Sequence, residues 1–136
     1  MIYATIEDIT TIYPKVLDTV AEWEGDTMNT NQVERSLEDA AEEIDMYLSS
    51  RYTLPLPSVP RSLRGMTVDI ALYKLSIMTE RRVKDMRLRY EDAVSRLRDI
   101  RSGKMGLGFE NAGDRDDGTP DDDVIDTIQM GSVIRG

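Results

Sequence analysis

Apolar residues recur at helical spacing over most of the first 104 positions. Near the start, Thr5 and Asp8 form the capping-box pattern that begins a helix, and isoleucines follow at positions 6, 9 and 12. Pro14 predicts a stop or a kink, and it also suits the first position of a second helix. The apolar positions of such a continuation are Val16, Leu17, Val20 and Trp23. The polar stretch EGDTMNT then interrupts the pattern.

The longest single apolar stripe belongs to the next predicted helix. Asn31 and Glu34 repeat the capping pattern, and the periodicity continues to about Tyr52. The apolar positions on one face are Val33, Leu37, Ala40, Ala41, Ile44 and Leu48. This spacing predicts one amphipathic helix of about 20 residues with one buried face.

Two further helices are predicted after a proline-rich stretch. The first runs from about Pro60 to Met78, with Leu63, Ile70, Ala71, Leu75 and Met78 in register. The second runs from about Glu80 to Ser102, with Val83, Tyr90, Ala93, Val94, Leu97 and Ile100 on its buried face. Gly103 follows where a helix C-terminus favours a left-handed residue. Nothing in the sequence near Thr79 forces a stop between these two helices.

The stretch RYTLPLPSVP, residues 51–60, lies between predicted helices. Proline moves the residue before it out of the helical region, so Leu54, Leu56 and Val59 are expected to be extended. Residues 53–59 would span about 20 Å in a polyproline-like path, more than a tight helix–helix turn needs. We therefore predict a strap, residues 53–59, that crosses the end of a helical bundle and is pinned on it by these three side chains.

The composition changes after Lys104. GKMGLGFENAGDRDDGTPDDD is rich in glycine and aspartate, and VIDTIQMGSVIRG is rich in β-branched residues without a helical period. We expect a helical bundle domain over residues 1–104 and an acidic linker with an extended C-terminal arm over residues 105–136. The predicted fold class is all-α: a compact four- to five-helix bundle with a Pro-rich strap and a non-helical arm.

The chain contains no cysteine and no histidine. This excludes disulfides, thiolate zinc sites, cysteine nucleophiles and histidine-based triads. Paired carboxylates are the catalytic scheme that remains, but no acid except Asp69 lies in an apolar context. A calcium loop that aligns Gly118 with the required glycine puts Val124 where a glutamate is needed. We therefore expect no enzymatic activity, no cofactor and no built metal site.

Charge is distributed unevenly along the chain. Residues 1–60 carry 12 acidic and 3 basic side chains, residues 61–104 carry 6 and 12, and residues 105–136 carry 8 and 2. Opposite charges on different parts of one molecule favour binding between copies, head to side. The alternative interpretation is that each run is the solvated face of an amphipathic helix.

Five basic residues cluster in the first half of the last predicted helix: Arg81, Arg82, Lys84, Arg87 and Arg89. Acidic residues are interleaved with them at three- or four-residue spacing, which favours pairing within the helix or contact with an acidic face of another copy. Transient contact with DNA is a further interpretation, because phosphate binding needs a basic surface. These five residues are the candidate interface.

Several segments together resemble a known family. They are MIYATIEDI, EIDMYLSSRYTLPLP, DIALYKL and RYEDAVSRLRDIRSGKMGLG, which extend from the start of the chain to about Gly108. They resemble the small α-helical proteins of Mu-like phages and prophages, a family grouped with head–tail connector, or adaptor, proteins of tailed phages. The residues that we single out as its structural motif are Asp45, Tyr47, Arg51, Tyr52, Leu54, Pro55, Leu56 and Asp69.

The resemblance implies a structural role in the virion. It implies a ring of about a dozen copies beneath the portal protein at the capsid vertex, where the ring would extend the DNA channel and contact a neck or tail component. The protein would be synthesised in the cytoplasm of the bacterial host and located in the neck, between head and tail. No run of about 18 apolar residues and no charged-then-apolar leader is present, so we expect a soluble protein without a membrane partner.

Two alternatives stay open. Asp45, Arg51 and Asp69 belong either to a subunit interface or to an ion pair that fixes the strap against the following helix, and the ion pair is the favoured interpretation. The alternative function is a small helical regulator that binds nucleic acid as a dimer through its last helix. A helix-turn-helix protein would need a short glycine-bearing turn before that basic helix, and the sequence has none.

Overall fold

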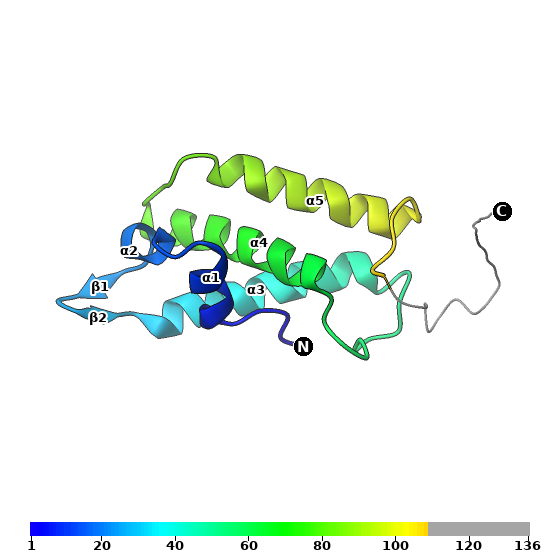
Figure 1. The fold of residues 1–136 in the computed structure, drawn as a ribbon, viewed down its shortest axis with the longest axis horizontal. Helices are drawn as coiled ribbons and strands as arrows, with labels where there is room; N and C mark the ends of the chain where they lie inside the picture. Colours follow the sequence, from blue (N-terminus) through cyan, green and yellow to red (C-terminus); the bar gives the residue numbers. More distant parts are fainter. Residues whose placement is uncertain (109–136) are drawn as a thin grey trace.

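The computed structural model describes residues 1–108, which form five helices and one short hairpin (Figure 1). The three long helices are α3 (Thr30–Leu48), α4 (Arg61–Thr79) and α5 (Met86–Ser102), and each runs antiparallel to the next. Helix α4 packs against both α3 and α5, and α1 (Ile6–Ile12) and α2 (Val16–Val20) also pack on it. The predicted all-α fold class is confirmed. The predicted linker and arm, residues 105–136, lie outside the described residues from position 109 onward.

The first helix begins as the sequence predicts. The backbone N–H of Asp8 donates to the Thr5 hydroxyl, and the backbone N–H of Thr5 donates to the Asp8 carboxylate at 2.9 Å. This reciprocal capping box satisfies donors that have no partner within the helix. The second helix is only five residues long and ends at Val20.

Trp23 does not continue that helix, so this prediction is wrong. It lies in β1 (Trp23–Glu24), which pairs antiparallel with β2 (Thr27–Met28), and its side chain is exposed. Gly25 lies in the intervening turn with a φ of +64°, a conformation that glycine adopts without a steric penalty. The stretch expected to be a polar break therefore contains a small hairpin.

Helix α3 buries all six residues of its predicted stripe. Its cap is Asn29 and not Asn31: the Asn29 side chain accepts a hydrogen bond from the backbone N–H of Gln32 at 3.2 Å. Asn31 lies within the first turn, so the predicted capping residue is wrong by two positions. The helix ends at Leu48, before the expected Tyr52, whose side chain is buried outside the helix.

The strap contains neither helix nor strand and leads from the end of α3 to the start of α4 (Figure 1). Leu56 is buried in the core, and Leu54 and Val59 are partly buried against it. Pro55 is exposed. The prediction that three apolar side chains pin the strap on the bundle is confirmed.

Helix α4 lies at the centre of the bundle and is buried on more than one face. Besides Leu63, Ile70, Ala71 and Leu75 from the predicted stripe, it buries Met66, Val68 and Leu72. Its buried Thr67 hydroxyl donates to the carbonyl of Leu63 at 2.7 Å, so this polar group has a partner. Met78, predicted to be buried, is exposed. Within residues 1–108, no helix combines the length and apolar character that a membrane span requires.

The break between α4 and α5 is confirmed near Thr79, but the start of α5 is wrong. Helix α5 begins at Met86 and not at about Glu80, because Glu80 and Asp85 adopt left-handed conformations, with φ of 59° and 67°. The intervening residues form a loop, so Arg81, Arg82 and Lys84 precede the helix. At the other end, Gly103 has a φ of +90°, as its position predicts.

Candidate functional site

The two acidic residues of the resemblance motif hold the N-terminal segment on the bundle. The Tyr3 hydroxyl donates a hydrogen bond to Asp45 on α3, and the Tyr13 hydroxyl donates to Asp69 on α4 at 2.7 Å. These bonds join residues 42 and 56 positions apart in the chain. The carboxylates therefore fix the two ends of a segment that contains α1.

The favoured ion-pair interpretation of Asp45, Arg51 and Asp69 is wrong. Among the described residues, neither carboxylate forms a salt bridge with Arg51. A tyrosine hydroxyl occupies the position that we assigned to the guanidinium, because α1 folds back across α4. Sequence reasoning did not identify either tyrosine as a partner of these carboxylates. The one available signal was that Tyr3 lies in MIYATIEDI, a segment that carries the family resemblance.

The environment of the contact between Asp69 and Tyr13 raises the pKa of both groups. Burial raises the pKa of Asp69, and the hydrogen bond from Tyr13 and the charges of Arg89 and Arg96 partly oppose this effect. Burial, followed by the hydrogen bond to Asp69, raises the pKa of Tyr13 to about 12. The Arg89 guanidinium also lies over the Tyr13 ring, 4.5 Å from its centroid. Asp69 and Arg89 therefore both contact Tyr13, and we call the contact between Tyr13 and Asp69 the clasp.

Arg51 and Tyr52, at the end of α3, contact the end of the described chain. The Arg51 guanidinium lies against Gly103, where an added Cβ would collide with it. The backbone N–H of Leu107 donates to the Tyr52 hydroxyl at 3.1 Å, and the Leu107 side chain is buried in the core. These two motif residues therefore position the segment that follows α5.

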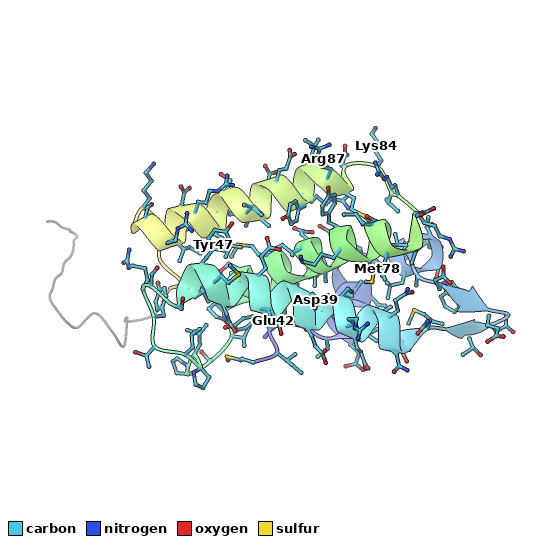
Figure 2. All side chains as sticks on the ribbon, turned by 180° about the vertical axis from the view of Figure 1, so that it is seen from behind. Asp39, Glu42, Tyr47, Met78, Lys84 and Arg87 are labelled. Atoms are coloured by element: carbon cyan, nitrogen blue, oxygen red, sulfur yellow. The ribbon has the colours of Figure 1, made fainter. Side chains whose placement is uncertain are left out.

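Tyr47 belongs to a second cluster, on the face where α3, α4 and α5 meet (Figure 2). The rings of Tyr73 and Tyr90 stack with centroids 4.4 Å apart, and the Tyr90 hydroxyl donates to Glu43 at 3.1 Å. Lys74 forms a salt bridge with the same Glu43 at 2.9 Å. A groove of about 660 Å³ is lined by Tyr47, Tyr90, Glu43 and Lys74, together with Met46. Sequence reasoning named Tyr47 but not Glu43 or Lys74.

The five basic candidates do not form one surface. The Arg81 guanidinium donates to the carbonyl of Ala21 at 2.7 Å, and Arg87 pairs with Glu91 one turn further along α5 at 3.1 Å. Arg89 lies on Tyr13, as described above. Arg82 and Lys84 are the members without a hydrogen bond or ion pair inside the described part of the chain. Their assignment as an interface stays a prediction.

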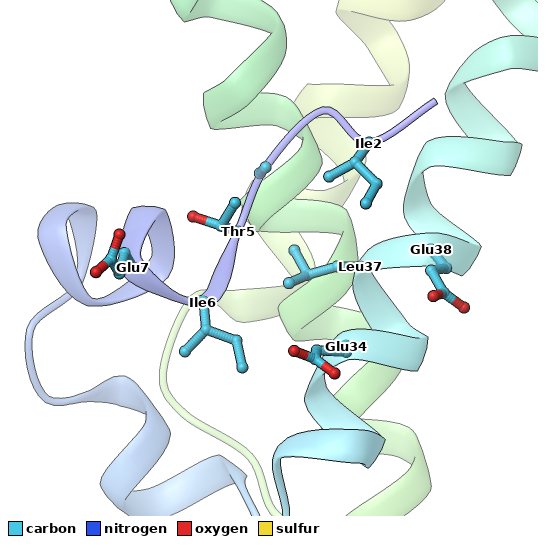
Figure 3. A pocket seen from close by; sticks show the side chains of 8 residues that line it. Ile2, Thr5, Ile6, Glu7, Glu34, Leu37 and Glu38 are labelled. Atoms are coloured by element: carbon cyan, nitrogen blue, oxygen red, sulfur yellow. The ribbon is translucent and has the colours of Figure 1, made fainter.

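A pocket of about 440 Å³ lies between the N-terminal segment and α3 (Figure 3). Ile2, Ile6 and Leu37 supply its apolar part. Glu7, Glu34 and Glu38 surround it with exposed carboxylates. We call these six residues the N-terminal pocket. No motif in the sequence pointed to it, because its two walls are about 30 positions apart in the chain.

The described residues contain no group of three or more acidic side chains placed to bind one metal ion. Their carboxylates instead accept hydrogen bonds from tyrosines, pair with bases or lie on the surface. The fold and its surfaces thus define a small all-α domain whose internal polar contacts position its N-terminal and C-terminal segments.

Comparison with known proteins places this domain in a family. Residues 3–125 match the family described as Bacteriophage Mu, Gp36, and the chain belongs to that family. It is 36% identical to the Mu-like prophage FluMu protein gp36 of Haemophilus influenzae over 82% of this chain and 79% of that protein. It is 32% identical to gene product J of Escherichia phage Mu over the same shares. The resemblance to Mu-like phage proteins is confirmed.

Proposed function

We propose that this chain is a structural head–tail connector, or adaptor, located in the neck of a phage particle. About a dozen copies form a ring beneath the portal protein, extend the DNA channel and present a surface to the next neck or tail component. The protein acts through binding alone, without catalysis, a cofactor or a membrane. Its contact with DNA in the channel is transient.

One observation carries this proposal beyond membership of the family. Three large apolar side chains are exposed where α4 passes into α5: Ile77, Met78 and Leu88. Figure 2 shows Met78 near the end of α4, and Lys84 and Arg87 at the outer edge of the bundle at the start of α5. Large exposed apolar side chains beside basic ones are typical of protein–protein interfaces.

The alternative function, a dimeric nucleic-acid-binding regulator, has less support. Three of its five basic residues are engaged within the chain, which leaves Arg82 and Lys84 for phosphates. If these two residues bind DNA, the affinity of the protein for DNA will fall steeply as the salt concentration rises. The double variant Arg82→Ala and Lys84→Ala will then show a weaker salt dependence. This effect is measured as the binding of a labelled duplex at low and at moderate salt. The double variant Asp39→Ala and Glu42→Ala is the matched surface control.

The connector proposal is tested in the phage or prophage that carries the gene. An in-frame deletion should give filled heads and separate tails in electron micrographs, and the wild-type gene in trans should restore joined particles. Mass spectrometry of purified particles should detect the chain. Joined, infectious particles after deletion, or particles that lack the chain, would overturn the proposal.

A further inference from the structure

The turn between α4 and α5 carries an exposed surface with apolar and basic parts. Ile77 is 54% exposed and Leu88 is 59% exposed. Leu88 lines a shallow depression with Tyr73, Arg82, Arg87 and one acidic residue, Asp85, and Arg87 is paired with Glu91. Tyr73 lies one turn before Ile77 on α4. Lys84 adds a further positive charge in the same loop. We call Ile77, Arg82, Lys84, Arg87 and Leu88 the α4–α5 surface.

The N-terminal pocket has the opposite character. Its apolar part includes Ile2, which is 65% exposed and lies on the N-terminal segment across from Leu37 in Figure 3. Its three charged residues are all glutamates. An apolar pocket among exposed carboxylates is expected to bind a partner that supplies apolar side chains together with positive charge.

The two surfaces match in chemistry but lie on different sides of the bundle. In Figure 1 the start of α5 lies along one edge, and α3 with the N-terminal segment lies along the opposite edge. One copy cannot close this contact on itself. From this charge and apolar complementarity we infer that the α4–α5 surface of one copy docks into the N-terminal pocket of the next.

Such a contact joins unlike surfaces, so it repeats from copy to copy and closes into a ring when the rotation permits. This inference rests on the proposed function and specifies which surfaces join the copies. DNA is a poor occupant of the pocket, because phosphates would meet Glu7, Glu34 and Glu38. A different protein of the particle is an outcome that the experiment below separates.

Cysteine cross-linking tests the contact, because the natural chain has no thiol. Full-length protein with Ile2→Cys and Leu88→Cys is produced in the phage, and purified particles are treated with a short bis-maleimide. We expect a ladder of covalent oligomers of this chain. Either substitution alone should give none, whereas a two-fold dimer that pairs like surfaces would link Leu88→Cys to itself.

The matched control combines Leu88→Cys with Met46→Cys, since Met46 is 75% exposed on α3 but lies outside the pocket. A ladder of equal strength in the control, or no ladder in particles that contain the chain, overturns the inference. A covalent product with a different protein through Leu88→Cys also overturns it. Wild-type particles that lack the chain overturn the connector proposal itself, so the two failures are distinguishable.

Charge exchange gives a second test with the same readout. Glu34→Lys with Glu38→Lys should lower the cross-linked yield at least about tenfold, because like charges then face each other. Arg82→Glu with Lys84→Glu should do the same, and the combination of both pairs should restore the ladder. Asp39→Lys with Glu42→Lys, on α3 outside the pocket, should have no such effect. If each pair of substitutions abolishes the ladder and the combined variant does not restore it, the proposed pairing of the two surfaces is overturned.

Discussion

Two segments cross the outside of the same bundle, and within residues 1–108 only one of them adds hydrogen bonds to the apolar contacts that attach it. The strap lies on the bundle through Leu56, Leu54 and Val59, whose apolar surface is wholly or partly removed from water. The N-terminal segment buries Tyr3, Ala4 and Ile9 in the same core and adds hydrogen bonds from Tyr3 to Asp45 and from Tyr13 to Asp69. Apolar burial tolerates small shifts, whereas a hydrogen bond requires one geometry. The comparison indicates that the N-terminal segment is the more exactly positioned of the two.

The largest expected effect comes from the strap. Leu56→Ala removes a buried side chain and leaves a cavity, so it should lower the free energy of unfolding by about 2–5 kcal/mol. Ser58→Ala, at an exposed position of the same strap, should change it by less than about 0.5 kcal/mol. Urea unfolding followed by circular dichroism measures both. Equal losses in the two variants would show that Leu56 does not pin the strap.

A smaller loss is expected when the N-terminal segment loses one hydrogen bond. Tyr3→Phe keeps the buried ring but removes the donor to Asp45, and a bond to a charged group contributes about 1.5–3 kcal/mol. Tyr47→Phe is the matched control, because the Tyr47 hydroxyl donates no hydrogen bond within residues 1–108. The same unfolding experiment applies. A Tyr3→Phe variant as stable as the control would contradict the role of this bond.

The smallest expected effect is a pH dependence of the free energy of unfolding, which the N-terminal segment should contribute and the strap should not. The pKa of Tyr13 is raised to about 12, so the folded chain keeps this proton at pH values where the unfolded chain has lost it. The contribution of Tyr13 is therefore complete below about pH 10 and decreases as pH rises toward 12. Stability measured between about pH 8 and about pH 11 should fall less steeply in Tyr13→Phe than in the wild type.

The control for this measurement is again in the strap. Leu56→Ala should shift the whole stability curve without changing its slope in this pH range, since no titratable group is removed. The stability curves of Tyr13→Phe and of the wild type could instead run parallel over this pH range. That result would show that the clasp between Tyr13 and Asp69 does not contribute to the alkaline loss of stability.

The periodic parts of the fold were predictable from local sequence. Thr5 and Asp8 mark a helix start, and the stripe from Val33 to Leu48 marks a helix face, because both signals lie within a few residues of the structure that they specify. The strap was predictable for the same reason, since proline acts on its direct neighbour.

The remaining features depend on residues that are distant in the chain. Glu80 and Asp85 adopt left-handed conformations that neither residue type specifies, so local sequence could not place the start of α5. The partners of Asp45 and Asp69 come from a segment more than 40 positions earlier. The motif indicated that these carboxylates matter to the fold, but their partners depend on how α1 folds across α4.

The place where the described part of the chain ends is fixed by two contacts, that of Arg51 with Gly103 and that of Tyr52 with Leu107. They place Gly108 at the end of the bundle opposite the α4–α5 turn (Figure 1). Rotation about one axis never inverts a copy relative to its neighbour. In the proposed ring, Gly108 of every copy would therefore lie at the same level along the ring axis. The ring would be polar, with one rim distinguished from the other, as an object between a head and a tail must be.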